Sequence, residues 1–149
     1  MVHGEVRRNW RETAIRCRRL ASALRRRGFG PGRTVAFLAA NTPELFEAHF
    51  GVPMMGGVLN AINTRLDAEA IAFVLSHGES RILFVDREFS AVARRAVALL
   101  GYRMTVVDID DPTYDGGELI GQTTYEAFLA EGDPDESFAS PQDEWDPIA

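Results

Sequence analysis

The residues best suited to chemistry lie in the segment VVDIDDPT, residues 106–113. Asp108 and Asp110 are one residue apart at the end of an apolar run, and Thr113 follows them. Two aspartates placed in this way can bind Mg²⁺ and offer one carboxylate as a nucleophile for phosphoryl transfer. The segment is therefore the first candidate for a metal-dependent site.

This segment resembles the aspartate motif of haloacid-dehalogenase-type phosphatases. Thr113 falls one position too late for that motif, however, and the motif normally opens its domain. The sequence also has no lysine to hold a phosphoryl group. Because short motifs often mislead, we interpret these aspartates as solvated loop residues at the end of a strand.

A second candidate is the glycine-rich segment GFGPGR at 28–33. Such loops bind phosphates when they join a strand to a following helix, whose N-terminal amides then face the ligand. Here a predicted helix comes before the glycines and a predicted strand comes after them. Pro31 also lacks an amide hydrogen. The segment is predicted to be a plain turn.

The histidines and the cysteine form no recognisable site. His3, His49 and His77 are scattered, and no two have a spacing suited to a shared metal ion. Cys17 falls on the apolar stripe of a predicted helix, which indicates a buried and inert thiol. One cysteine excludes an internal disulfide and fits a reducing compartment, so a cytoplasmic location is expected. The residues alone identify no catalytic group and no metal ligand.

Composition and charge limit the classes of function. The chain has 149 residues, 46% of them hydrophobic, and a net charge of −6, values typical of one globular domain. All basic residues are arginine, which excludes mechanisms that need a lysine. Arginines crowd residues 7–27 and the chain is acidic after Asp108, so general nucleic-acid binding is not expected. No apolar run approaches the ~20 residues of a transmembrane helix.

The elements that must position these residues follow from apolar periodicity and capping signals. Asn9 and Glu12 form a capping-box pattern at the start of the first helix. Asn41 or Thr42 is expected to cap the second helix, and Asp67 the third. The predicted helices cover residues 9–27, 43–55, 68–78 and 88–100, and the predicted strands cover residues 34–39, 58–62, 81–86 and 102–109.

This alternation of helices and strands predicts an α/β fold, a partial doubly wound parallel sheet with helices on both faces. A short helix, TYEAFLAEG at 124–132, is expected after the last of these strands, with Thr123 and Glu126 at its N-terminal cap. The core is expected to span residues 9–131. Residues 132–149 are expected to form an acidic linker.

Two asparagines are candidate binding residues because of their place in the predicted sheet. Ligands of parallel sheets gather at the carboxyl ends of the strands. Asn41 and Asn63 follow two of these strands and lie at such ends. Asparagine at such positions serves more often as a capping or turn residue, so that alternative stays open for both.

A longer pattern runs through residues 18–66. It contains a Leu-Ala-x-x-Leu helix, a turn with paired glycines, an Asn-x-Pro-Glu segment and a Gly-x-x-x-x-x-Asn run. Together these resemble the opening of an AMP-forming acyl-CoA synthetase of the adenylate-forming superfamily, closest to fatty-acyl or related carboxylate CoA ligases. The family's aspartate after the second turn glycine is replaced by Arg33. The matching residues are Leu20, Ala21, Leu24, Gly28, Gly32, Asn41, Pro43, Glu44, Gly57, Val58, Asn63 and Leu66.

The resemblance implies a parent enzyme that uses ATP, Mg²⁺ and CoA to activate a carboxylic acid. In that family a segment like DEWDPIA, residues 143–149, leads into a Ser/Thr/Gly-rich loop that wraps the ATP phosphates. The start VHGEVRRNW resembles a hairpin before the first helix. We therefore expect an N-terminal fragment, truncated at both ends, that has no catalytic residue and is inactive alone.

A different class of function also stays open, namely a stand-alone, non-catalytic interaction or regulatory module. Such a module should bury the faces and edges of its own sheet. Cooperative unfolding of a soluble monomer would favour the module, whereas aggregation or loose packing would favour the fragment. Neither the identity of the acid nor the oligomeric state follows from the sequence.

Overall fold

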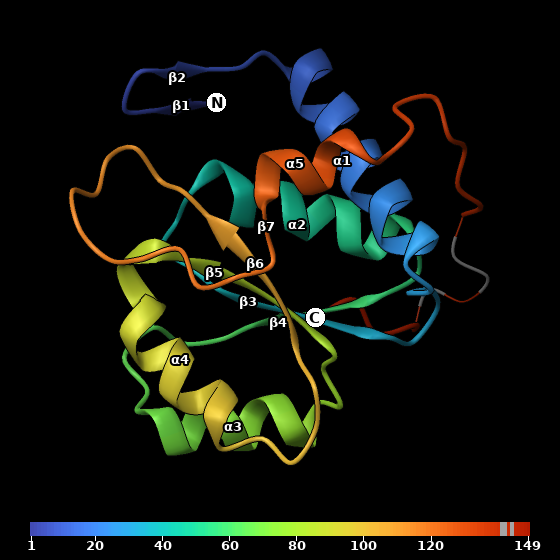
Figure 1. Ribbon diagram of the computed structural model, residues 1–149. Coiled ribbons are helices and arrows are strands. Elements are labelled where there is room, and N and C mark those ends of the chain that lie inside the picture. The colour runs from blue at the N-terminus through green and yellow to red at the C-terminus, as the bar shows by residue number, and fades with distance from the viewer. Residues whose placement is uncertain (141–142, 144) are drawn as a thin grey trace.

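A five-stranded, all-parallel sheet in the order β4-β3-β5-β6-β7 forms the centre of the molecule. The computed structural model describes residues 1–140, 143 and 145–149 (Figure 1). The predicted α/β fold with a parallel sheet is confirmed. The strands are β3 (Thr34–Leu38), β4 (Val58–Ala61), β5 (Ile82–Asp86), β6 (Thr105–Ile109) and β7 (Thr123–Thr124).

Helices cover both faces of this sheet, as Figure 1 shows. One face carries α1 (Trp10–Arg26), α2 (Pro43–Met54) and α5 (Tyr125–Ala130). The other carries α3 (Ala68–His77) and α4 (Ser90–Ala98), the latter preceded by the 3₁₀ turn η1 (Arg87–Phe89). An antiparallel hairpin of β1 (Val2–His3) and β2 (Val6–Arg7) precedes α1, as the sequence led us to expect.

The apolar runs of the central strands follow from burial on both sides. Neighbouring residues of a strand point to opposite faces, so Phe37 and Phe84 pack under α1 and α5 while Leu38 and Val85 pack under α3 and α4. Phe37 and Phe84 are paired in register, and their rings stack with centroids 4.4 Å apart. The sequence of a strand that is buried on both faces is therefore continuously apolar and does not alternate between apolar and polar residues.

The helix caps agree with the sequence prediction except in one case. The capping box of α1 is present, with the Glu12 amide donating to Asn9 Oδ1 at 2.9 Å and the Asn9 amide donating to Glu12 Oε2 at 2.8 Å. Thr42, rather than Asn41, caps α2. At α5 the prediction of Thr123 is wrong, because Thr124 accepts the hydrogen bond from the helix and Thr123 belongs to β7.

Strand β7 has no counterpart in the sequence prediction. It has only two residues, too few for a period-two pattern to show. The side chain of Gln122 helps to hold it in place, because its Oε1 accepts from the Val106 amide at 2.7 Å. The strand predicted from residue 102 begins instead at Thr105.

The glycine segment is a turn, as predicted. Gly28 and Gly32 have φ values of +84° and +73°, a conformation that residues with a Cβ atom rarely adopt. The segment joins the C-terminus of α1 to β3, so the helix comes before the glycines and not after them.

The expected acidic linker contacts the body at several points. The Asp133 amide donates to Ser22 Oγ at 2.9 Å, and Glu136 pairs with Arg25 at 2.9 Å. Residues 141, 142 and 144 of that linker lie outside the described residues. The predicted boundary at 131 stays a prediction. Over the described part of the chain, no helix has the length and apolar character needed to cross a membrane.

Candidate functional site

The order of the strands singles out one position at the carboxyl edge of the sheet. From β3 the chain crosses to β4 on one side, whereas from β5 it crosses to β6 on the other side. Neighbouring strands whose connections diverge in this way leave a crevice at their carboxyl ends, where open α/β sheets bind ligands. Here the crevice lies between the ends of β3 and β5, beside Asn41 and Asp86.

The two predicted asparagines follow β3 and β4, which are neighbours, and both side chains are exposed. Asn63 Oδ1 accepts from the Arg65 amide at 2.9 Å, so this side chain holds a turn. Asn41 has no side-chain hydrogen bond to any other described residue and does not cap α2. Asn41 therefore stays a predicted binding residue, and Asn63 has a local structural role.

Asp86 is a residue of this edge that the sequence prediction missed. Its carboxyl group is buried, and Oδ1 accepts from the Glu88 amide at 3.0 Å. Oδ2 is buried without a hydrogen-bond partner within the described residues. Burial raises the pKa of Asp86. The only available signal was a charged residue at the end of the apolar run ILFVD.

Asp111 anchors the N-terminal hairpin to the same edge. It accepts from the Thr113 amide at 2.8 Å and from the Thr113 hydroxyl at 2.9 Å, and His3 Nε2 lies 3.1 Å from its carboxylate. Burial alone would raise the pKa of Asp111, but the hydrogen bonds from Thr113 and His3 lower it overall. His3 thus has a specific partner that its place in the sequence did not reveal.

The two aspartates of the opening motif have separate structural roles. Asp108 accepts from the Ile120 amide at 2.9 Å and the Gly121 amide at 2.8 Å, which folds the following loop back onto β6. The interpretation of Asp108 as solvated is wrong, because it is buried. Asp110 is exposed and pairs with Arg87 at 2.6 Å. Across the described residues, no group of His, Cys, Asp and Glu side chains is arranged to hold a metal ion.

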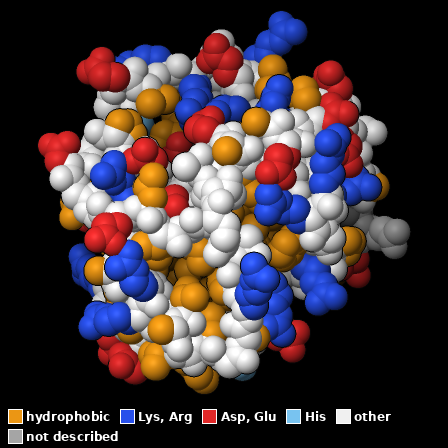
Figure 2. Space-filling view, in the orientation of Figure 1, with side chains coloured by type: hydrophobic (Ala, Val, Ile, Leu, Met, Phe, Trp, Pro, Cys, Tyr) orange, Lys and Arg blue, Asp and Glu red, His pale blue; other side chains and the backbone are white. Residues whose placement is uncertain are grey.

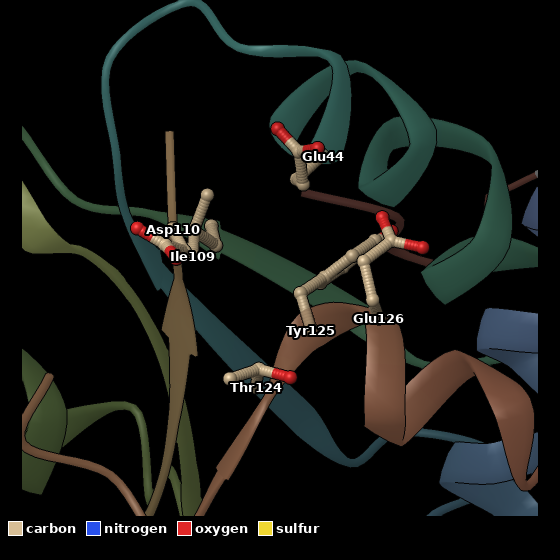
Figure 3. Close-up of a pocket in the computed structure, with 6 residues that line it drawn as sticks. All are labelled: Glu44, Ile109, Asp110, Thr124, Tyr125 and Glu126. Carbon is tan, nitrogen blue, oxygen red and sulfur yellow. The ribbon is translucent and has the colours of Figure 1, made fainter. Parts of the chain in front are cut away.

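A pocket of about 280 Å³ opens next to these residues, between the ends of β6 and β7 and the start of α2. Figure 3 shows the carboxylates of Glu44 and Glu126 above a floor that includes Tyr125. Asp110 and Ile109 lie across the opening from them. An acidic rim of this kind repels phosphate groups and favours cations. Figure 2 shows acidic and basic side chains interspersed elsewhere on this face.

A buried ionic network lies behind the pocket. Glu47 is fully buried, and its carboxylate accepts from Arg8 at 2.9 Å, Arg16 at 2.7 Å and the Tyr125 hydroxyl at 3.0 Å. Burial raises the pKa of Glu47 despite these partners. Arg16 also binds Glu126 through two hydrogen bonds of 2.8 and 2.5 Å. We call these five residues the Glu47 network, and it joins α1, α2 and α5.

The predicted burial of Cys17 is confirmed. Cys17 is buried in α1, and this burial raises the pKa of its thiol to about 11. The thiol is therefore protonated at neutral pH and is a poor nucleophile.

Comparisons with known proteins identify the family. The model of the family described as AMP-binding enzyme matches residues 1–148. The whole chain aligns with 28% of the peroxisomal acetate/butyrate–CoA ligase of Arabidopsis thaliana at 45% identity. It also aligns, again over its whole length, with 28% of the acetate–CoA ligase of Humulus lupulus at 40% identity.

A solved structure agrees in fold. The anthranilate CoA ligase crystallised with anthranoyl-AMP superposes on 87% of this chain, with a TM-score of 0.74 and 20% identity, over 24% of its own length. At this identity the likeness concerns the fold alone. The chain spans about 28% of the length of the two relatives named above. Because the family model matches almost every residue, the chain belongs to the AMP-binding enzyme family.

Proposed function

We propose that this chain forms the N-terminal part of an ATP-dependent acyl-CoA synthetase. The proposal depends chiefly on the family match over residues 1–148, supported by 45% identity to a CoA ligase. In the proposed reaction, a carboxylate oxygen attacks the α-phosphorus of ATP and pyrophosphate leaves. The thiol of CoA then attacks the acyl carbon, and AMP leaves. ATP, Mg²⁺ and CoA are thus the proposed cosubstrates and cofactor of the whole protein.

Within that enzyme, we propose that the described residues supply scaffold rather than catalytic groups. The carboxyl edge carries the carboxylates of Asp86, Asp110 and Asp111. Arg87 is a cation beside them, but it is already paired with Asp110. Phosphate groups need cationic or amide donors, and the charged side chains that line the pocket, Glu44, Asp110 and Glu126, are all acidic. The residues present therefore do not fit the phosphates of ATP, and we expect the 149-residue chain to be inactive alone.

The acid is proposed to be an aliphatic carboxylic acid, of the fatty type expected from the sequence. The two relatives above are named for acetate and butyrate, so short chains are the first substrates to test. A cytoplasmic location is also proposed from the single cysteine. The peroxisomal location is given in the name of the Arabidopsis thaliana relative and is said of that protein alone.

A chimera tests the proposal directly. In it, this chain replaces the aligned 28% of the acetate/butyrate–CoA ligase, and acid-dependent ATP–pyrophosphate exchange is measured with acetate, butyrate and longer acids. We expect the folded chimera to catalyse exchange and the 149-residue chain to catalyse none. A chimera that shows native circular dichroism but no exchange with any acid would contradict the proposed function.

Point variants of the chimera test the carboxyl edge. Loss of one hydrogen bond to a ligand costs about tenfold in kcat/KM. We expect Asn41→Ala to lower kcat/KM by about that factor if Asn41 faces a ligand. Glu69→Ala is the matched control, because Glu69 is exposed on α3, on the opposite face of the sheet from α2. Equal activity of both variants would remove Asn41 from the site.

The stand-alone module stays as the second candidate. In its favour, each face of the sheet has its own buried core and its own helices within this chain. Thermal unfolding distinguishes the two functions, since a module should unfold cooperatively as a soluble monomer. Aggregation or dye binding before unfolding would favour the N-terminal part of a larger enzyme.

A further inference from the structure

A second pocket, of about 680 Å³, opens at the amino ends of the strands, opposite the carboxyl edge. Its walls are the turn before β3, the turn before β4 and part of the C-terminal segment, and we call it the amino-edge pocket. Cavities of about 300–1,000 Å³ with mostly apolar walls are typical small-molecule sites. The larger apolar side chains that line it are Phe29, Pro31, Pro53, Met54, Met55, Phe138, Pro147 and Ile148.

The C-terminal segment is held on both sides of this pocket. Arg25 of α1 pairs with Glu136 at 2.9 Å and lies over the Phe138 ring, 5.4 Å from its centroid. The Leu59 amide of β4 donates to the Ile148 carbonyl at 2.9 Å. Phe138 and Ile148 both line the pocket, so these contacts keep the outer wall of the pocket in place.

The charges around the amino-edge pocket favour a cation over an anion. Asp143 and Asp146 line it, and neither carboxylate forms an ion pair within the described part of the chain. Asp143 Oδ1 accepts from the Trp145 amide at 3.0 Å, which leaves its charge unbalanced. Arg25 also lines the pocket, but Glu136 already balances its charge. Negative charges on the wall of a cavity attract cations.

A helix end adds to this attraction. The carbonyl end of a helix has a partial negative charge that attracts cations. α1 and α2 both end beside the pocket, α2 at Met54. The last turn of α1 contains Arg25 and Arg26, whereas the last turn of α2 contains no basic residue. The negative end of α2 is therefore not balanced by its own side chains.

The apolar side chains suit the body of a ligand whose other end is positive. Phe29 and Phe138 contribute aromatic rings to the lining, and ammonium groups bind to the faces of such rings. Met54 and Met55 have flexible thioethers, which adapt to ligands of different shapes. The lining thus combines an apolar surface with negative charge, and a molecule with an apolar body and one positive end matches both.

We propose that the amino-edge pocket binds a small organic cation with an apolar body, such as an alkylammonium ion. The apolar body lies against Phe29, Met54 and Met55, and the ammonium group faces Asp143 and Asp146. The pocket and the carboxyl edge lie at opposite ends of the strands, so this ligand is not a substrate of the proposed reaction. The proposal also does not depend on that reaction.

The test follows isotope-labelled methionine methyl groups by NMR while hexylammonium is added. Met54 and Met55 line the pocket, whereas Met104 is buried in the cluster under α3 and α4 and reports on overall folding. Hexanol and hexanoate are the matched ligands, because they have the same chain with a neutral or a negative end. The titrations are carried out on the 149-residue chain and on the chimera described above, so a chain that does not fold alone leaves the test intact.

We expect hexylammonium to shift the signals of Met54 and Met55 and to leave that of Met104 unchanged. It should bind at least about tenfold more tightly than hexanoate, with hexanol between them. Hexanol or hexanoate binding as tightly as hexylammonium would overturn the proposal. So would the absence of any shift at Met54 and Met55 in both proteins, or an equal shift at Met104, which would indicate an effect on the whole fold.

A double variant tests the role of the two carboxylates. Asp143→Asn with Asp146→Asn should weaken the binding of hexylammonium by about tenfold and leave that of hexanol unchanged. Asp135→Asn is the matched control, because Asp135 is an exposed residue of the same segment that does not line the pocket. If the double variant bound hexylammonium as tightly as the control, the proposed cation site would be wrong.

Discussion

The two helical layers that cover the sheet are held together by different forces. The layer of α1, α2 and α5 contains the Glu47 network, in which a fully buried carboxylate meets two arginines and a tyrosine hydroxyl. The layer of α3 and α4 contacts the sheet through an apolar cluster rich in alanine and leucine. The helices of one layer are thus linked to one another by directional polar bonds as well as by apolar contact, and those of the other layer mainly by packing.

This difference bears on how each layer tolerates change. A buried ion pair need not add net stability, but removing one partner is costly because the other charge stays buried. An apolar layer responds instead to the volume that is lost. The first layer is therefore expected to be specific in geometry and intolerant of single substitutions. The second should respond in proportion to the cavity that a substitution creates.

The strongest test of this contrast is Glu47→Ala. The substitution removes the fully buried carboxylate that Arg8, Arg16 and the Tyr125 hydroxyl share, and breaking a buried pair in this way costs about 3–5 kcal/mol. We expect a loss of that size in the free energy of unfolding, measured by urea denaturation. Glu126→Ala is the matched control, because Glu126 is largely exposed and should cost at most about 1 kcal/mol. Equal losses would show that the buried Glu47 carboxylate contributes no more to stability than the exposed Glu126 carboxylate.

The corresponding test in the other layer is Leu75→Ala. Leu75 is fully buried in α3, and such a truncation costs about 2–5 kcal/mol through lost contacts and the cavity left behind. Because no charge is involved, the loss should be the same at low and high salt. A loss that changed strongly with salt would mean that this layer also depends on charge interactions.

A smaller change within the network is Tyr125→Phe. It keeps the ring, which packs edge-on against Phe84 at 5.8 Å, and removes only the hydroxyl that donates to Glu47. A buried acceptor left without its donor costs roughly 1–3 kcal/mol. Thermal unfolding should show the loss in the native background and almost none when Glu47 is already alanine. Equal losses in both backgrounds would contradict the coupling.

The smallest expected effect concerns acid. Hydrogen bonds from Arg16 lower the pKa of Glu126. A carboxyl whose pKa is lower in the folded state adds stability above its unfolded pKa of ~4.3, and this is lost as the pH falls through the folded pKa. The native protein should therefore lose more stability than Glu126→Gln between neutral and acid pH, measured by urea denaturation. Parallel pH profiles would show that the Arg16–Glu126 pair adds nothing.

Local chemistry was sufficient to predict most of the fold. The capping box of Asn9 and Glu12, the cap at Asp67 and the glycine turn after α1 depend on neighbours in the sequence, and all were correct. β7 was missed because its two residues become a strand only through pairing with β6. No local pattern shows a pairing between distant segments.

The candidate site was less predictable for the same reason. We predicted that Asp108 is solvated. Its carboxylate instead accepts hydrogen bonds from the amides of Ile120 and Gly121, more than ten residues later in the sequence. Asp86 and His3 gain their positions at the carboxyl edge only when the strands are ordered. By contrast, the family could be identified from the sequence, because its motifs occur along the chain in the expected order and spacing.

The strand order also has a consequence for biosynthesis. β3 pairs with β4 on one side and with β5 on the other, so a nascent chain can complete the first pairing long before the second. Until β5 leaves the ribosome, one side of the apolar strand β3 has no partner and can associate with other chains. Chaperones that bind exposed apolar strands are therefore expected to act on the nascent chain until β5 has emerged.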